Sequence, residues 1–248
     1  MIDAMRVQIA AGPRAFPGPS GAIPVTARAA AIQPARPALP SASAAAETGV
    51  DVALVLAADT SGSISNQDVV LQIRGYAQAV ASSAFLRAVR SGPHGRAALT
   101  FVTWSSAGRH DQLVPWTLID TISTAEQFAA TLLEAPGPVP GYTSISGAID
   151  FAQQVLFACE FASERRIIDI SGDGSNNDGR AVRDARDDAV AAGITINGLP
   201  LVRRESDIAT YYAENVVGGP GAFVVVAENS EAFPASILKK LVAEVAAG

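Results

Sequence analysis

Cysteine and histidine are scarce in this chain. Its 248 residues include one cysteine, Cys159, and two histidines, His94 and His110. A single cysteine cannot form an internal disulfide or a cysteine-based metal cluster. With two histidines, the chain has few candidate residues for a histidine-based zinc site or for a Ser-His-Asp triad. These shortages argue against a disulfide-stapled scaffold and against thiol or imidazole chemistry.

Positive charge is also in short supply. The chain carries 18 Lys and Arg against 24 Asp and Glu, which gives a formal net charge of -6. A nucleic-acid-binding surface needs clustered Lys and Arg, so we do not expect nucleic acid as a partner. Long hydrophobic runs are missing too, since none approaches the about 20 residues of a membrane-spanning helix. The sequence therefore predicts no transmembrane segment.

The first 48 residues lack hydrophobic periodicity and are rich in Pro, Ala, Gly and Ser. Such a composition cannot bury enough apolar surface to offset the entropy of ordering, so we predict that residues 1–48 are disordered. Residues 38–47 resemble the cleavage region of a secretory signal peptide, but the apolar region that should precede it is absent. Two interpretations stay open: a damaged leader, which implies a periplasmic or secreted protein, and an Ala/Pro-rich linker, which implies a cytoplasmic one.

From Val50 onward, strand-like and helix-like patterns alternate. The first is an almost unbroken apolar run to Ala58, typical of a strand buried on both faces. The alternation predicts one α/β domain over residues 49–248, doubly wound and Rossmann-like, with helices on both faces of a mostly parallel sheet of about six strands. A short turn between the strands expected at 97–104 and 113–119 favours one antiparallel edge strand.

The C-terminal part of the chain completes this pattern. We expect the last strand at residues 222–227 and a closing helix at 233–245. The apolar residues of that helix recur at helical spacing. This spacing places Lys239 and Lys240 on the outer face of the helix as solvated charges.

Carboxylate and hydroxyl side chains gather where predicted strands end. Asp59, Ser61 and Ser63 follow the first strand. Thr143 lies just ahead of a helix, and Asp173 follows a later buried strand. In an open parallel sheet, ligands bind at the carboxyl ends of strands where the strand order reverses, so these five residues can meet there. Two carboxylates and three hydroxyls suit Mg²⁺ or another small divalent ion better than zinc or copper.

The spacing of these residues resembles a known motif. Asp59-x-Ser61-x-Ser63, then Thr143 in a Gly-rich loop, then Asp173 with a glycine after it, are similar to the metal-ion-dependent adhesion site of von Willebrand factor A-type domains. D-x-S-x-S alone is a weak signal. The three segments, in this order and on these elements, are far more specific.

The resemblance extends from Val50 to the C-terminus in motif order and in the alternation of elements. Residues 171–177 and 114–117 are similar to an uncharacterised bacterial branch of this superfamily, known as a domain of unknown function. One departure stands out. Gly172 occupies a position where relatives often carry threonine, which removes no metal ligand but alters the surroundings of the ligands.

The resemblance implies a von Willebrand A-like fold and a bound Mg²⁺, or Mn²⁺ or Ca²⁺ in its place. Ser61, Ser63 and Thr143 would offer hydroxyl oxygens, while Asp59 and Asp173 would bind the ion directly or through water. One coordination position would stay open for an Asp or Glu carboxylate of a partner protein. This implies a binding module and not an enzyme. The resemblance also places six residues around the ligands: Gly62, Tyr142, Ser144, Gly174, Asn176 and Asn177.

Other interpretations of the same residues stay open. Asp59 and its serines fit a helix N-cap, and a serine beside Thr143 could replace it as cap or ligand. Asp173 also begins a sequence like an EF-hand calcium loop, although Asp178 stands where that loop needs glycine. A Mg²⁺-dependent hydrolase could use Asp59 as nucleophile, but such enzymes usually have a second Asp where this chain has Ser61. A structural domain with a silent metal site is the last alternative.

Overall fold

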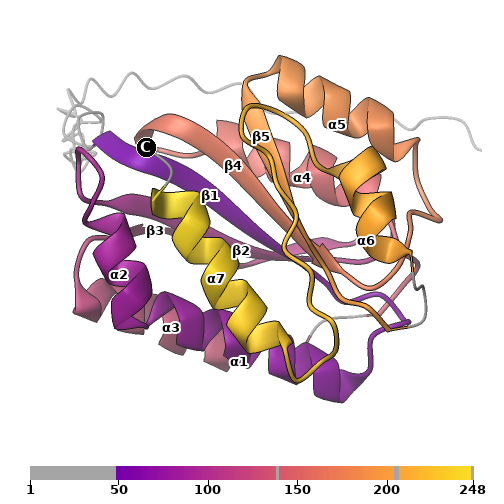
Figure 1. Ribbon diagram of the computed structural model, residues 1–248, viewed down its shortest axis with the longest axis horizontal. Coiled ribbons are helices and arrows are strands. Elements are labelled where there is room, and N and C mark those ends of the chain that lie inside the picture. The colour runs from indigo at the N-terminus through magenta and orange to yellow at the C-terminus, as the bar shows by residue number, and fades with distance from the viewer. Residues whose placement is uncertain (1–48, 138–139, 204–206, 247–248) are drawn as a thin grey trace, which may run out of the picture. The chain divides into compact units, whose positions relative to one another are not determined.

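The computed structural model describes residues 49–137, 140–203 and 207–246, so the disorder predicted for residues 1–48 lies outside the described part. The described residues form a five-stranded sheet in the order β3-β2-β1-β4-β5 (Figure 1). Its strands are β1 (Gly49–Asp59), β2 (Ala97–Trp104), β3 (His110–Ile119), β4 (Ala162–Gly172) and β5 (Ile194–Pro200).

The sheet is parallel except at one edge. β1 pairs in parallel with β2 and β4, and β4 pairs in parallel with β5. β3 is antiparallel to β2, as the short turn between them predicted. Every residue of β1 after Gly49 is buried, because the strand has a neighbour on each side and helices over both faces. The apolar run from Val50 to Ala58 is thus explained by its central place.

Helices cover both faces of the sheet (Figure 1) and bury a separate hydrophobic cluster on each. One face is covered by α1 (Asn66–Val80), α2 (Ser83–Val89), α3 (Ile122–Glu134) and α7 (Phe233–Ala246). The other is covered by α4 (Ile145–Phe157), α5 (Val182–Ala191), α6 (Ile208–Tyr211) and the π-helical turn η1 (Tyr212–Val216). In the part of the chain that the structure describes, none of these helices has the length and apolarity to cross a membrane.

The sixth strand expected at residues 222–227 does not form. This segment runs beside β5 but joins it only through isolated bridges, from Val224 to Gly198 and from Ala227 to Leu201. Two features interrupt the ladder. Pro200 has no amide hydrogen to donate, and the N–H of Phe223 donates to the side-chain Oδ1 of Asn197 at 3.1 Å.

The expectation for Lys240 was wrong, whereas Lys239 is exposed as predicted. The Lys240 side chain is fully buried, with Nζ 2.6 Å from Asp169 Oδ1 and 2.5 Å from Glu244 Oε1. Asn197 Nδ2 donates to the same Glu244 oxygen at 2.9 Å. A buried charge needs partners. Here β4 supplies one carboxylate, and the next turn of α7 supplies the other.

Candidate metal site

The carboxyl ends of β1 and β4 lie side by side at the point where the strand order reverses. From β1 the chain goes to β2 on one side of the sheet and later returns to β4 on the other side. Asp59 is the last residue of β1, and Asp173 directly follows β4. Both residues are buried, with 0% and 2% of their surface exposed. The fold therefore brings two carboxylates, 114 positions apart in the sequence, to its usual ligand-binding edge.

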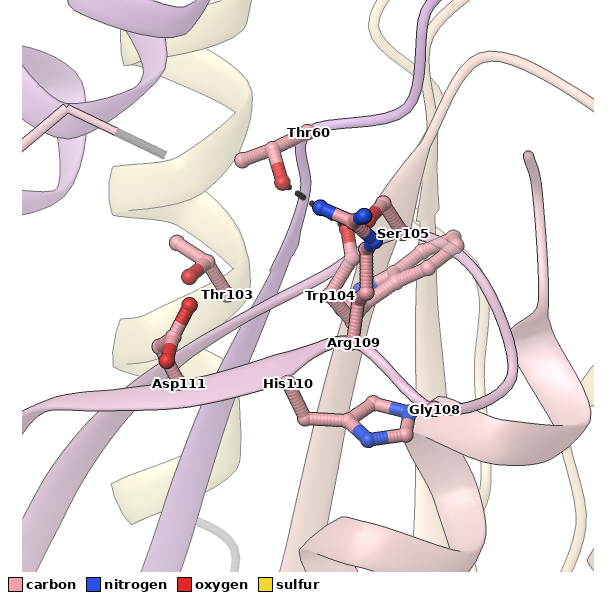
Figure 2. A pocket seen from close by; sticks show the side chains of 8 residues that line it. All are labelled: Thr60, Thr103, Trp104, Ser105, Gly108, Arg109, His110 and Asp111. Atoms are coloured by element: carbon pink, nitrogen blue, oxygen red, sulfur yellow. Dashed lines mark hydrogen bonds between the residues drawn. The ribbon is translucent and has the colours of Figure 1, made fainter. Parts of the chain in front are cut away.

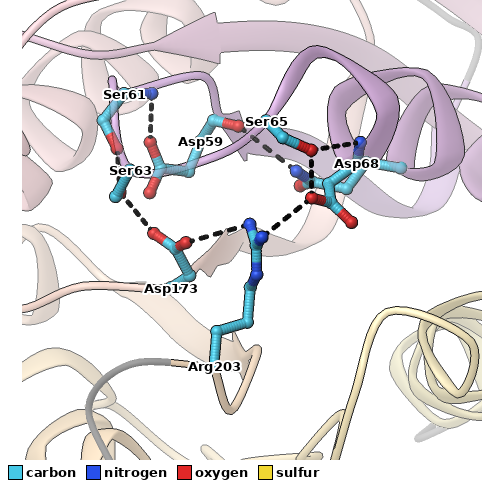
Figure 3. A network of polar contacts seen from close by, with 8 residues as sticks. Asp59, Ser61, Ser63, Ser65, Asp68, Asp173 and Arg203 are labelled. Atoms are coloured by element: carbon cyan, nitrogen blue, oxygen red, sulfur yellow. Dashed lines mark hydrogen bonds and ion pairs between the residues drawn. The ribbon is translucent and has the colours of Figure 1, made fainter.

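Hydrogen bonds join four of the predicted ligands (Figure 3). The Ser61 amide donates to Asp59 Oδ1 at 2.7 Å, and the hydroxyls of Ser61 and Ser63 are 2.9 Å apart. The Ser63 hydroxyl donates to Asp173 Oδ1 at 2.5 Å. The D-x-S-x-S segment thus turns its oxygens toward the second carboxylate.

Thr143 lies in a loop that is held between the other two segments. It is 4% exposed. The amide of Gly62 donates to Gly141 O at 2.8 Å. The Thr143 amide donates to Asn177 Oδ1 at 2.9 Å, and the Asn177 amide donates back to Thr143 O at 2.8 Å. The third predicted segment therefore meets the first at Gly62 and the second at Asn177.

The helix N-caps bear on two alternative interpretations, in which Asp59 or Thr143 serves as a helix cap. The N-cap of α1 is Ser65, whose hydroxyl accepts from the Asp68 amide at 3.2 Å, so Asp59 is not the cap of that helix. The N-cap of α4 is Ser144, whose hydroxyl accepts from the Gly147 amide at 3.2 Å. Because a neighbouring serine caps α4, the hydroxyl of Thr143 is not needed for that purpose.

The residues predicted around the ligands divide into two groups. Asn176 and Asn177 hold the loops together, since Asn176 Oδ1 accepts from the Ser146 amide at 3.0 Å and Asn177 binds the Thr143 backbone. Tyr142, by contrast, is 72% exposed. Gly62 is also exposed, whereas Ser144 and Gly174 are buried. Tyr142 is thus the large side chain among these six that a partner could touch.

The environment of Asp59 disfavours its negative charge. Burial raises the pKa of Asp59 to about 7, hydrogen bonds from Ser61 oppose this rise, and the charge of Asp173 adds to it. Its Oδ2 is buried and has no hydrogen-bond partner among the residues described. A buried, unpaired carboxylate oxygen is costly. A divalent ion would offset that cost, so the donor set fits a hard cation.

Acidic clustering would not have revealed this site. In the described ranges, no group of three or more His, Cys, Asp or Glu is arranged to hold a metal ion. Among the five predicted ligands the carboxylates are Asp59 and Asp173, and the other three residues, Ser61, Ser63 and Thr143, carry hydroxyls. A set of two carboxylates and three hydroxyls has too few acidic residues to be recognised by such a grouping.

The structure gives a reason for glycine at position 172, where the resemblance leads one to expect threonine. A Cβ at this position would stand 2.8 Å from Asp59 Oδ2 and 2.7 Å from the hydroxyl of Tyr212. Glycine therefore makes room for the buried carboxylate and for a tyrosine from η1. Sequence reasoning singled out Gly172 but missed Tyr212, because the π-helical turn that carries it has no recognisable motif.

Arg203 is a second residue that sequence reasoning missed. It follows β5, and its Nη1 lies 3.5 Å from Asp173 Oδ2 while its Nη2 lies 3.0 Å from Asp68 Oδ2 (Figure 3). The guanidinium therefore bridges a predicted metal ligand and the first turn of α1. A lone arginine in an irregular segment carries no sequence signal for this role.

A cavity of about 180 Å³ lies beside the site (Figure 2). It is formed at the end of β2 and the start of β3, with Arg109, His110 and Asp111 on one side and Thr60 on the other. The Thr60 hydroxyl donates to Trp104 O at 3.0 Å, which ties the loop after β1 to the end of β2. None of the five predicted ligands lines this cavity. The cavity is therefore a neighbouring feature, separate from the candidate metal site.

Solved structures with a similar fold come from animals and bacteria. Proximal thread matrix protein 1 from the mussel byssus, described with a zinc-occupied MIDAS motif, has a TM-score of 0.58 and 14% identity over 79% of this chain and 46% of its own. The pilus adhesin SpaC from Lactobacillus rhamnosus GG has a TM-score of 0.55 and 13% identity over 79% of this chain and 31% of its own.

A third structure, the vWF domain of the type V pili tip protein Mfa5 from Porphyromonas gingivalis, matches with a TM-score of 0.54 and 10% identity. The match covers 77% of this chain and 94% of that domain. The chain spans less than half the length of the mussel protein and of SpaC. These likenesses define the class: the described domain has the von Willebrand factor A fold.

The sequence comparison is more specific. Residues 49–248 match the family model described as "Protein of unknown function (DUF1194)", and the chain belongs to this family. No curated protein matches the chain. The family assignment agrees with the sequence resemblance and leaves the function to be argued from the site.

Proposed function

We propose that this domain is a protein-binding module that depends on a divalent metal ion and captures an acidic side chain of its partner. The observation that carries the proposal is the buried Asp59 Oδ2, which has no hydrogen-bond partner within the described residues and lies within electrostatic reach of Asp173. Two such carboxylates beside three hydroxyls form a donor set for a hard cation. The cation would in turn attract a carboxylate from outside.

Each segment has a defined part in this proposal. Asp59 and Asp173 hold the ion and neutralise its two charges, and the hydroxyls of Ser61, Ser63 and Thr143 complete the donor set. When bound, Mg²⁺ or a similar ion supplies a Lewis-acidic position that an Asp or Glu of the partner can fill. Tyr142 is exposed beside Thr143 and offers an aromatic surface to the partner.

The similar structures support a partner that is a protein. SpaC is a pilus adhesin and Mfa5 is a pili tip protein, while the mussel protein has a zinc-occupied MIDAS motif. Their identity to this chain is 10 to 14%, so they support the kind of activity and not a particular ligand. We propose Mg²⁺ as the ion, with Mn²⁺ and Ca²⁺ as the alternatives to be compared.

The first test measures stabilisation by metal. Free ligand at 100 times its dissociation constant stabilises a folded protein by about 2.7 kcal/mol. We expect Mg²⁺ to raise the free energy of unfolding of the wild-type protein, and Asp59→Ala to abolish this response without unfolding the domain. Glu126→Ala is the matched control, because Glu126 is an exposed carboxylate on α3. An equal response to Mg²⁺ in Asp59→Ala would refute the site.

The second part of the test concerns the partner. Surface-bound wild-type protein, Asp59→Ala and Glu126→Ala are exposed to a set of acidic peptides and to the same peptides with Asp and Glu replaced by Asn and Gln. We expect binding only of acidic peptides, only with Mg²⁺, and not to Asp59→Ala. Retention that is indifferent to a chelator would contradict the proposal.

A further inference from the structure

Arg203 connects the candidate metal site to a third carboxylate. Its Nη1 is 3.5 Å from Asp173 Oδ2, and its Nη2 is 3.0 Å from Asp68 Oδ2. The Arg203 side chain is 24% exposed, that of Asp68 is 13% exposed, and that of Asp173 is 1% exposed. Partly buried ion pairs are screened less than fully exposed ones. The bridge is therefore an electrostatic part of the site (Figure 3).

The two oxygens of Asp173 have different partners in this arrangement. Oδ1 accepts from the Ser63 hydroxyl, on the side of the other predicted ligands, whereas Oδ2 is paired with Arg203. Arg203 thus pairs with one oxygen of Asp173, and the other oxygen faces the D-x-S-x-S segment. Asp68 fixes the guanidinium from behind and is itself held by the hydroxyl of Ser65.

The local charges can be counted. Asp59, Asp173 and Asp68 contribute three negative charges, and Arg203 contributes one positive charge. Without the arginine, the three carboxylates would carry one more negative charge than a divalent ion can neutralise. The positive charge of Arg203 cancels this excess negative charge. The ion therefore keeps its attraction for an external anion.

We propose that Arg203 is a positioning residue that acts through Asp173 and sets the affinity of the site for its metal, holding that affinity down so that the bound ion stays open to an acidic ligand. This inference rests on the proposed function. In a water-like medium, the loss of one unit charge close to a divalent ion corresponds to roughly a tenfold change in the affinity for that ion.

Arg203 and Asp68 carry opposite charges, so their variants give opposite predictions. In calorimetric titrations with Mg²⁺ and with Mn²⁺, we expect Arg203→Gln to bind the metal about tenfold more tightly and Asp68→Asn to bind it more weakly. The double variant restores the local charge and should return close to the wild-type affinity. Arg203→Lys keeps the charge and should also stay close to wild type.

Arg87→Gln is the control, since Arg87 lies on α2 and contacts Ser83 of the same helix. Thermal unfolding without metal checks that each variant is folded. A purely structural bridge would weaken binding in both single variants, and that result, or unchanged affinity in Arg203→Gln, overturns the inference. Arg203→Lys behaving like Arg203→Gln also overturns it, because the charge would then not be the cause.

Metal binding by the wild-type protein, Asp59→Ala and Arg203→Gln separates the role of Arg203 from the proposed function. If the wild-type protein binds Mg²⁺, Asp59→Ala does not, and Arg203→Gln binds like wild type, the metal site stands and the role of Arg203 falls. If the wild-type protein binds neither Mg²⁺ nor Mn²⁺, both fall together.

Discussion

At the scale of single residues, the candidate site depends on which side chains are allowed close to Asp59. Its Oδ1 accepts from the Ser61 amide, while its Oδ2 lies in a buried space bordered by Gly172. The absence of a side chain at position 172 is as much a part of this arrangement as the carboxylate itself. A residue type can therefore matter because of the atoms it does not have.

Gly172→Ala tests this point. The new Cβ would stand 2.8 Å from Asp59 Oδ2 and 3.2 Å from Asp59 Cβ, so the carboxylate must move. We expect a loss of about 1–3 kcal/mol in the free energy of unfolding and a weaker response to Mg²⁺, both measured by urea denaturation. Gly108→Ala is the matched control, because a Cβ there meets no atom of the described residues within 4 Å. Wild-type behaviour of Gly172→Ala would contradict the close approach.

At the scale of elements, α7 is attached to the sheet by charge as well as by apolar packing. Ile237, Leu241 and Val245 pack into the core, and Lys240 between them reaches Asp169 on β4. Burial is the main cause that raises the pKa of Glu244 to about 7, with the charges of Lys240 and Asp169 acting in opposite directions. The ammonium is thus what makes two buried carboxylates tolerable at this interface.

Lys240→Met should therefore be strongly destabilising. The variant keeps an aliphatic side chain of similar length but leaves the carboxylates of Asp169 and Glu244 buried without their cation. Breaking a buried pair in this way costs about 3–5 kcal/mol, which urea denaturation would measure. Lys239→Met is the control, since Lys239 is the exposed neighbour on the same helix. Equal stability of the two variants would show that the buried ion pairs contribute nothing net.

At the scale of the whole molecule, stability should depend on pH and metal together. The pKa of Asp59 and that of Glu244 are both raised to about 7 in the folded protein. A carboxyl whose pKa is raised by folding contributes stability below its unfolded pKa, and this contribution is lost as the pH rises through the folded pKa. Metal-free protein should then become less stable as the pH increases.

We accordingly expect the free energy of unfolding in a chelator to fall between pH 5 and pH 8. One pKa unit corresponds to about 1.36 kcal/mol, and about two units separate pH 5 from the pKa of about 7, so Asp59 contributes about 2.7 kcal/mol at most over this range. Asp59→Asn should flatten part of this dependence. Mg²⁺ should stabilise the protein more at pH 8 than at pH 5, because the ion needs ionised ligands. A metal-free stability that rises over this range would contradict the assignment.

Much of the fold was predictable because hydrophobic pattern determines it. The apolar run before Asp59 predicted a central strand, and the short turn before β3 predicted the antiparallel edge. The strand expected at residues 222–227 does not form because Pro200 and the Asn197 side chain interrupt the hydrogen-bond ladder. The hydrophobic pattern of a sequence does not indicate which acceptor a backbone amide will bind. The metal ligands themselves remain a prediction, supported by the way the three loops meet.

The sequence by itself determined the class of the domain, the order of most of its elements and the residues that end its central strands, because periodicity and local turn chemistry are properties of short segments. Only the tertiary structure decided what surrounds those residues. It brought Arg203 to Asp173, placed Tyr212 beside Gly172 and turned Lys240 inward to Asp169. Contacts between distant segments depend on which faces meet when the sheet and helices pack, and no local pattern encodes them.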